Sequence, residues 1–214
     1  MNLHTKIAVI GGTGKSGQYL VKNLLQKGYS IKMLVRNPQH LKPFMDSAEI
    51  ITGDVTEYQS IYDTLSGCCA IISTLGLGLP PSEPTIFSHS AQNIIKAANI
   101  LGINRYIVTT GLNVSTPDDD KTAGTQMATD WMYTNYPIST HDKQEEYELL
   151  INSNLNFTMV RLPLIELTDD LADVSINLKD CPGNAISATT LASFLVSQLN
   201  DTSYHRKAPF VFNI

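Results

Sequence analysis

A short apolar run that leads into three evenly spaced glycines constrains this chain more than any other feature. The run covers residues 7–10, and Gly11, Gly14 and Gly17 follow it at intervals of three. A brief apolar run of this kind is typical of a buried strand, and the residues after Gly17 have the spacing of a helix. A strand that turns through small residues directly into a helix predicts the first βα unit of a parallel α/β sheet.

The turn has the composition of an anion-binding loop, because small residues let a ligand approach the backbone closely. Free N–H groups in the first turn of the following helix, together with the helix dipole, favour a negative charge there. At the end of a first strand, this spacing predicts a pyrophosphate site for a dinucleotide. The residues expected to bind it are Gly11, Thr13, Gly14, Lys15, Ser16 and Gly17.

The sequence Gly14-Lys15-Ser16 also matches the end of the loop that binds nucleoside triphosphates. That loop needs another glycine five residues before Gly14. Val9 stands at that place, inside the expected strand, so a triphosphatase is not favoured. The plainer alternative is that the glycines only form a tight turn.

The remainder of the chain repeats the alternation of short apolar runs and helical segments. This rhythm predicts a Rossmann-like α/β fold, a doubly wound parallel sheet with helices on both faces and right-handed crossovers. At this length, residues 1–214 are expected to form a single domain. Strands are expected at 31–35, 50–51, 70–73, 106–109 and 157–160, and helices at 16–27, 56–65, 85–101, 141–152 and 189–199.

Residues 113–140 interrupt the rhythm with prolines, three successive aspartates and several aromatic residues. A long irregular connection usually has a role, so this one is predicted to be a substrate or lid loop. The alternative is a surface insertion whose aromatic side chains pack on the body of the protein or on a second subunit. Residues 162–188 are expected to contribute to a small cap over the substrate.

Charge, hydropathy and cysteine spacing exclude several classes of protein. The formal net charge of −5 provides no positive field for nucleic acid. No apolar run approaches the roughly 18 residues that span a bilayer, and the run near the N-terminus is too short for a signal peptide. We therefore expect a cytoplasmic protein with no membrane and no nucleic-acid partner. Because Cys68, Cys69 and Cys181 form no CxxC pair, we expect buried, reduced thiols and no metal site.

The segment after the glycines indicates which dinucleotide is bound. A site selective for NADH carries an acidic residue about 20 residues further on, which accepts hydrogen bonds from the ribose 2′-hydroxyl. No Asp or Glu occurs between Gly17 and Asp46, whereas Arg36 directly follows the expected strand 31–35. A guanidinium there can bind a 2′-phosphate with two parallel donors. NADP(H) is therefore favoured over NAD(H); the alternative for Arg36 is an ordinary solvated side chain at a strand end.

Four segments together carry a resemblance to a known family. They are the glycine turn, Leu34-Val35-Arg36-Asn37-Pro38, Gly53-Asp54-Val55, and residues 143–163 with a lysine, a glutamate and a strand that ends in Arg and Pro. The chain resembles the atypical short-chain dehydrogenases/reductases. Among these it is most similar to the small NAD(P)H-binding group that includes flavin reductases, biliverdin-IXβ reductases and NmrA-like proteins.

The resemblance implies which further residues contact the cofactor. Those that follow the third and fourth strands, and so pass the adenine and the nicotinamide ribose, are Asp54, Val55, Thr74, Leu75 and Gly76. Lys143 takes the place of the lysine that binds the ribose in this family. A helix at 141–152 would hold Lys143 in its first turn, facing the cleft at the carboxyl edge of the sheet. The alternative is that Lys143 is a surface lysine at a helix start.

One element of the typical short-chain dehydrogenases is missing. No tyrosine precedes a lysine by four residues, and Ser139 stands where that tyrosine would be. The candidate catalytic groups are therefore Lys143, the hydroxyl of Thr110, and the imidazole of His141 as a proton donor. The alternatives are that Thr110 is a packing residue and that His141 caps the start of its helix.

These features predict a reductase that transfers a hydride from NADPH to a flavin, a quinone or a similar conjugated acceptor. Such an acceptor would be a small-molecule substrate, bound by a monomer or a homodimer. The missing tyrosine leaves open a non-catalytic NAD(P)-binding regulator or redox sensor of the NmrA type. A sugar-nucleotide epimerase is a third alternative, although the chain after residue 160 is too short for a large sugar-nucleotide domain.

Overall fold

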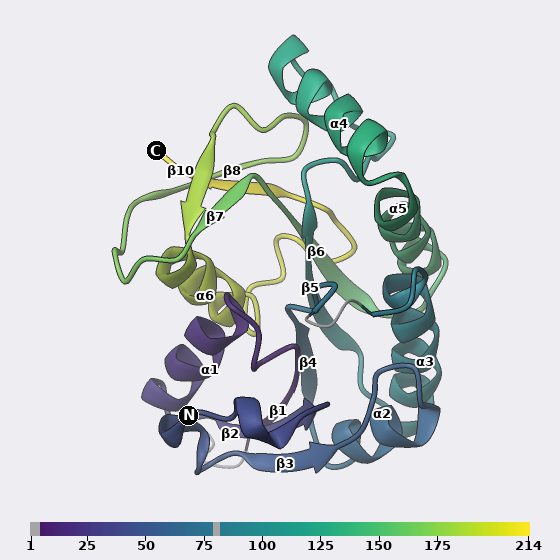
Figure 1. The fold of residues 1–214 in the computed structure, drawn as a ribbon, viewed down its shortest axis with the longest axis vertical. Helices are drawn as coiled ribbons and strands as arrows, with labels where there is room; N and C mark the ends of the chain where they lie inside the picture. The colour runs from purple at the N-terminus through teal and green to yellow at the C-terminus, as the bar shows by residue number, and fades with distance from the viewer. Residues whose placement is uncertain (1–4, 79–81) are drawn as a thin grey trace.

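The frame of the protein is one large, mostly parallel sheet. The structure, a computed structural model, describes residues 5–78 and 82–214. The strands of the main sheet are β1 (Lys6–Ile10), β2 (Ser30–Val35), β3 (Glu49–Thr52), β4 (Ala70–Ser73), β5 (Arg105–Gly111), β6 (Asn156–Leu162), β8 (Val174–Asn177) and β10 (Phe210–Asn213). They lie in the order β3-β2-β1-β4-β5-β6-β10-β8 (Figure 1). Neighbours from β3 to β10 are parallel, and β8 runs antiparallel to β10.

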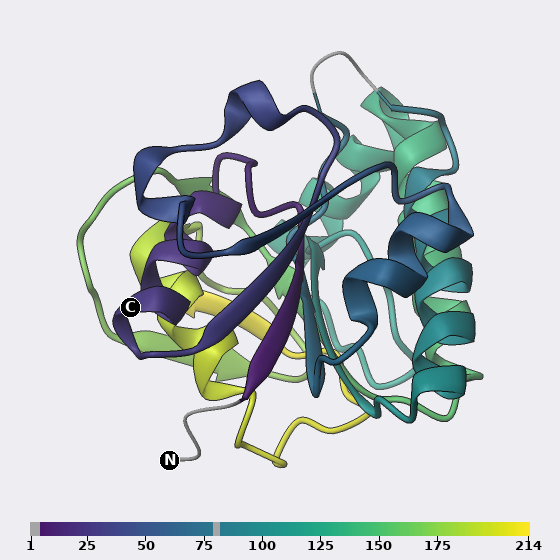
Figure 2. The same cartoon turned by 90° about the horizontal axis from the view of Figure 1, so that it is seen from below.

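Helices cover both faces of this sheet (Figure 2). One face carries α1 (Gly17–Gln26) and α6 (Ala188–Ser197), and the other carries α2 (Tyr58–Leu65), α3 (Ile86–Leu101) and α5 (Pro137–Ile151). Strand side chains alternate between the two cores, so that Ile7 and Val9 pack with α1 while Ala8 and Ile10 pack with α2 and α3. The expected doubly wound α/β fold is confirmed, and each expected strand is present.

The strand order determines where a ligand can bind. The chain leaves β1 toward β2 and β3 on one side and then continues from β4 to β6 on the other side. In doubly wound sheets, ligands bind outside the carboxyl ends of the strands at the point where this order reverses. That point lies between β1 and β4, from which the glycine turn and the segment after residue 73 both emerge.

The prediction of an irregular connection over residues 113–140 is wrong for its second half. α4 (Ala123–Asn135) occupies much of it, and α5 begins at Pro137 rather than near residue 141. Apolar periodicity did not indicate α4 because its buried residues are Thr125 and Thr129. Their hydroxyl groups donate to backbone carbonyls at 3.1 and 2.9 Å, which satisfies them without an apolar face.

The segment after β6 contains strands that the sequence did not indicate. β7 (Leu164–Glu166) and β9 (Ala185–Ser187) form a separate two-stranded parallel sheet, whereas β8 extends the main sheet. Within residues 5–78 and 82–214, no helix combines the length and the hydropathy needed to cross a membrane.

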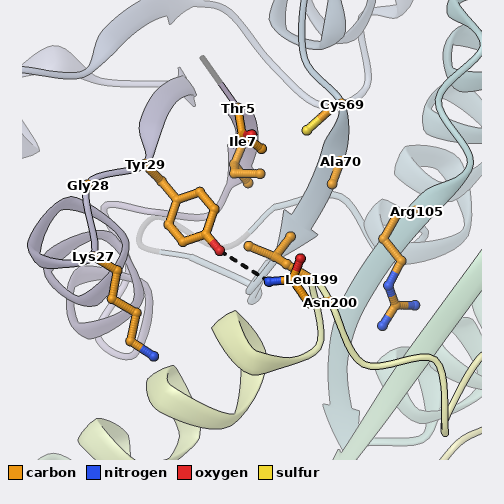
Figure 3. Close-up of a pocket in the computed structure, with 10 residues that line it drawn as sticks. All are labelled: Thr5, Ile7, Lys27, Gly28, Tyr29, Cys69, Ala70, Arg105, Leu199 and Asn200. Atoms are coloured by element: carbon orange, nitrogen blue, oxygen red, sulfur yellow. Dashed lines mark hydrogen bonds between the residues drawn. The ribbon is translucent and has the colours of Figure 1, made fainter. Parts of the chain in front are cut away.

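The expectation of three buried thiols holds for Cys68 and Cys181 but is wrong for Cys69, which is exposed. Cys69 lies just before β4, at the amino edge of the sheet, where its N–H donates to the Lys6 carbonyl at 2.9 Å. It lines a cavity of about 510 Å³ together with Tyr29, Arg105 and other residues of that edge (Figure 3). This cavity is therefore at the opposite edge of the sheet from the glycine turn.

A fully buried arginine on β6 fastens the segment before α4 to the sheet. Arg161 Nη1 donates to Asp119 Oδ1 at 2.6 Å and to the Val114 carbonyl at 3.1 Å. Its Nε donates to the Ala208 carbonyl at 2.7 Å and its Nη2 to the Leu178 carbonyl at 3.1 Å. Three separate stretches of chain thus meet on one guanidinium, and residues 113–121 are held at the carboxyl end of β6.

Removal of the Asp119 carboxylate should destabilise the fold, because the Arg161 guanidinium would remain buried without its counter-charge. We expect Asp119→Ala to lower the free energy of unfolding by about 3 kcal/mol, measured by urea unfolding. Asp118→Ala, an exposed aspartate of the same turn, is the matched control and should change it by less than about 0.5 kcal/mol. Equal effects of the two substitutions would contradict the structural role given to Arg161.

Candidate functional site

The glycine turn is held in a tight conformation by its own backbone. Gly11 has a φ of +76°, which favours glycine, and its carbonyl accepts a hydrogen bond from Gly14 N at 3.0 Å. A Cβ at Gly17, where α1 begins, would strike that same carbonyl. A Cβ at Gly11 would instead strike the Thr74 backbone, so a separate steric reason explains each of these two glycines.

The turn also leaves several backbone donors open. Within the described chain, no group accepts a hydrogen bond from the N–H of Thr13, Lys15, Ser16 or Gly17. α1 has no acidic residue in its first turn, and the Ser16 side chain makes no capping hydrogen bond. Open N–H groups at a helix N-terminus form a binding site for an anion, so this cradle fits the pyrophosphate of a dinucleotide.

The loop after β4 lies directly against the glycine turn. Thr74 N donates to the Ile10 carbonyl at 2.9 Å, and Thr74 Oγ1 donates to the Gly11 carbonyl at 3.3 Å. A Cβ at Gly11 would lie only 2.7 Å from the Thr74 carbonyl carbon, whereas a Cβ at Gly76 would meet none of the described residues within 4 Å. The expected residues Thr74, Leu75 and Gly76 are therefore brought beside the turn, and the space around Gly76 is open.

The carboxyl ends of β2 and β3 hold the other expected cofactor residues. Arg36 is exposed directly after β2, and its Nη1 donates to Ser82 Oγ at 3.1 Å, which brings the side chain toward the segment that follows β4. The Asp54 carboxylate accepts from both N and Oγ1 of Thr56, at 3.0 and 2.9 Å, and so stabilises its own turn. Val55 is buried in the core beside α2 and α3.

Lys143 is not in the first turn of its helix, because α5 begins six residues earlier at Pro137. Its Nζ lies 3.7 Å from the centre of the Phe87 ring, in the first turn of α3. Within the described chain, Nζ has no hydrogen-bond acceptor and no ion-pair partner. Burial of the ammonium lowers the pKa of Lys143, which Glu146 and then Asp142 partly oppose. The amino group is thus placed at the end of the loop that follows β4, with its donors open.

Asp142 fastens α5 to the start of α3. Its two carboxylate oxygens accept from Phe87 N at 2.7 Å and from Ser88 N at 3.2 Å. The Thr85 side chain makes no capping bond, so Asp142 replaces a local cap from another helix. No local sequence pattern indicates the role of Asp142, because its partners lie more than 50 positions away. Its effect is to fix Lys143, the next residue, against Phe87.

The two remaining catalytic candidates, Thr110 and His141, lie in different surroundings. Thr110 is buried, and its Oγ1 has no hydrogen-bond partner in the described chain. His141 does not cap α5, and its exposed ring packs on Tyr133 of α4 at 5.1 Å between centroids. Residues two apart do not face each other on a helix, so His141 is turned away from Lys143. Ser139, four residues before Lys143, shares its helix face and donates to the Tyr136 carbonyl at 3.3 Å.

A methyl group at Gly11 should destabilise the protein, because its φ is unfavourable for other residues and because the Thr74 backbone leaves no room. We expect Gly11→Ala to lower the free energy of unfolding by about 2 kcal/mol or more in thermal or urea unfolding. Gly124→Ala on α4, where nothing lies within 4 Å, should be neutral or stabilise by up to about 1 kcal/mol. An unchanged stability of Gly11→Ala would mean that the contact between the two loops is not required.

Comparisons with known proteins identify the family of this chain. The sequence profile of an NAD(P)H-binding family matches residues 11–202. Cinnamoyl-CoA reductase 1 of Petunia hybrida is 28% identical over 127 residues, 54% of this chain and 38% of that protein. The photosystem II assembly factor Ycf39 of Cyanophora paradoxa is 28% identical over 160 residues, 73% of this chain and 44% of that protein. In both comparisons, the matched region spans less than half the length of the relative.

Solved structures share the architecture. A short-chain dehydrogenase/reductase from Veillonella parvula, solved in complex with NADP, superposes with a TM-score of 0.83 at 18% identity and covers 98% of this chain and 94% of its own. At that identity the likeness establishes the fold, and the sequence profile, which covers most of the chain, establishes the family. The chain belongs to the NAD(P)H-binding protein family, and it has the Rossmann-like fold of the short-chain dehydrogenases/reductases.

Proposed function

We propose that the protein binds NADPH at the carboxyl ends of β1 and β4 and reduces a flavin, a quinone or a similar conjugated acceptor. The observation that carries the proposal is the set of open donors on both sides of this point. The N–H groups of residues 13 and 15–17 lie on one side, and Lys143 Nζ lies on the other, at the first turn of α3. The bound dinucleotide supplies the hydride, so the chain needs to hold and orient it.

The two sets of donors suit different parts of the cofactor. The backbone N–H groups of the glycine turn carry partial positive charge and suit the pyrophosphate. Lys143 Nζ, which has no acceptor of its own in the described chain, suits the hydroxyl groups of the nicotinamide ribose. The open space around Gly76 lets the ribose pass between them. In this arrangement Asp142 is a positioning residue, because it acts by fixing Lys143.

A preference for NADPH over NADH rests on charge at the end of β2. Arg36 is exposed there, and the chain carries no acidic side chain from Gln18 to Met45 that would accept from a ribose 2′-hydroxyl. A planar guanidinium suits a 2′-phosphate, which a hydroxyl cannot replace. NADPH therefore gains an ion pair that NADH lacks.

The choice of a conjugated acceptor follows from the residues that would deliver a proton. The chain lacks a tyrosine four residues before Lys143, Thr110 is buried, and His141 faces α4. An acceptor that delocalises the incoming charge does not require a strong acid beside it, and solvent can deliver the proton. The similarity to a cinnamoyl-CoA reductase supports a reductase rather than an epimerase.

Two segments are proposed to shape the acceptor site. α4 exposes Met127 and Trp131 at helical spacing, and Leu164 and Leu167 are exposed just after β6. Both stretches leave the carboxyl edge of the sheet, so their apolar side chains suit a flat, apolar acceptor. We propose that they form a lid and a small cap of a single domain.

A non-catalytic regulator is the second candidate, because the assembly factor Ycf39 matches 73% of this chain. In that case the exposed aromatic residues of α4 would serve as a docking surface for a protein. The two candidates differ in whether bound NADPH is consumed.

The cofactor preference is tested by titration of NADPH and NADH into the wild-type protein and into Arg36→Ala. Loss of a charged hydrogen bond to phosphate should weaken NADPH binding by about 10-fold to 100-fold and leave NADH binding nearly unchanged. Lys42→Ala, an exposed cation of the same connection, is the control and should have little effect. Equal weakening for both dinucleotides would contradict the phosphate contact.

The reaction is tested with a panel of flavins, quinones and conjugated ketones, with NADPH oxidation followed by absorbance. We expect at least one acceptor to be reduced well above the uncatalysed rate, and Lys143→Ala to lose most of that rate because the ribose is no longer held. Tight NADPH binding without consumption across the panel would favour the regulator instead.

A further inference from the structure

A buried carboxyl group lies behind Lys143 in the layer between α3, α5 and β5. Glu146 follows Lys143 by three residues on α5, which places the two on neighbouring parts of one helix face. Its side chain is only 2% exposed, and its Oε2 has no hydrogen-bond partner in the described chain. The fully buried Tyr106 hydroxyl on β5 likewise has no partner. Buried polar atoms are nearly always hydrogen-bonded in proteins, so such a cluster requires an explanation.

Asp142 and Glu146 both act on Lys143, but they are not equivalent. Both oxygens of Asp142 already accept N–H groups from the first turn of α3. Glu146 makes no such bonds through Oε2, and no ion pair within 4.0 Å joins it to Lys143. The hydrogen bonds of Asp142 therefore join α5 to α3. Glu146 has no such bonds through Oε2 in the described chain, so a change in its protonation state breaks none there.

The other charged and titratable groups around Glu146 have different partners. On α3, His89 is exposed and bonded to Glu83, and Lys96 lies over the Tyr58 ring. Tyr133 of α4 packs on His141, and Tyr147, next to Glu146 on α5, packs on Phe157 of β6. The groups that act on the Glu146 carboxyl are Lys143 and Asp142, and Tyr106 responds to it from β5.

We propose that Glu146 is a positioning residue that acts through Lys143, by providing a buried negative charge on the same helix face that stabilises the lysine ammonium. This inference rests on the proposed function of Lys143 as a ribose ligand. At neutral and alkaline pH, an ionised Glu146 compensates the desolvated ammonium through the low-dielectric layer. At lower pH Glu146 takes up a proton from solvent, and Lys143 stays protonated at that pH without a nearby negative charge. The ribose site thus stays cationic over a wider range of pH.

The direction in which the pKa of Glu146 is shifted is consistent with this arrangement. Burial raises the pKa of Glu146 to about 7, against the opposing effect of Lys143. A raised pKa means that the folded protein binds a proton that the unfolded chain has released. The corresponding stabilisation is complete below about pH 4.5 and is lost as the pH rises through about 7. This loss of stability with rising pH can be measured without the cofactor.

The direct test measures the reactivity of Lys143 in the cofactor-free protein. Trace labelling with acetic anhydride, read by mass spectrometry from pH 6 to pH 11, reports the fraction of each lysine that is deprotonated. In Glu146→Gln, we expect the midpoint for Lys143 to fall by about one pH unit, because a nearby negative charge is removed. Glu145→Gln, which changes an exposed neighbour, should leave the midpoint unchanged. An unchanged midpoint in Glu146→Gln would overturn the inference.

Two further measurements distinguish an effect of the Glu146 charge on Lys143 from a general loss of structure in the variant. Unfolding followed between pH 4.5 and pH 8 should show a decline in wild-type stability that Glu146→Gln lacks. If Glu146→Gln does not fold, Glu146→Asp keeps the charge, so it should fold and retain most of the wild-type midpoint of Lys143. A midpoint lowered by a full unit in a folded Glu146→Asp protein would contradict a role of the charge.

NADPH titrations at several pH values connect the inference with the cofactor. The pH at which affinity falls should be lower in Glu146→Gln than in the wild type, by the same amount as the labelling midpoint. Binding that is identical at every pH would overturn the inference while leaving the proposed function intact. Absence of NADPH binding in the wild type would refute the proposed function, and labelling of Lys143 would still decide whether Glu146 sustains its charge.

Discussion

The contact between Gly11 and Thr74 is the constraint on which the rest of the site depends. Because β1 and β4 are neighbours, the turns that leave them are in direct contact. Two hydrogen bonds from Thr74, to the Ile10 and Gly11 carbonyls, hold the two turns together. Only a residue without a Cβ fits there with a positive φ. The glycine turn consequently lies against the sheet, and among residues 5–78 and 82–214 no group accepts a hydrogen bond from the N–H of Thr13, Lys15, Ser16 or Gly17. The proposed cofactor site is thus a consequence of how two strands pack.

Two buried carboxylates then fasten the less regular parts of the chain to this frame. Asp119 pairs with Arg161 and holds the segment before α4 at the end of β6. Asp142 accepts the N–H groups at the start of α3 and thereby fixes Lys143 against Phe87. Both bonds are shielded from solvent, where a charge without its partner is costly. The position of Lys143 relative to the glycine turn therefore depends on contacts made outside the proposed cofactor site.

Much of the frame could be predicted from the sequence because its signals are local. Short apolar runs indicate strands, and the glycine spacing indicates the turn. α4 gave no such signal because threonines occupy its buried positions, and the start of α5 was placed too late although Pro137 is a common first helical residue. The partners of Asp119 and Asp142 lie 42 and 55 residues away, so no spacing rule reveals them. The exposure of Cys69 likewise depends on which sheet edge it occupies.

The central claim is that the open N–H groups of the glycine turn hold the pyrophosphate of NADPH. Amide hydrogen exchange, measured residue by residue with and without NADPH, tests it most directly. We predict slower exchange at Thr13, Lys15, Ser16 and Gly17 when NADPH is present, because these donors then gain acceptors that they lack in the part of the chain that the structure describes. NADPH binding that leaves exchange at these four residues unchanged would contradict it.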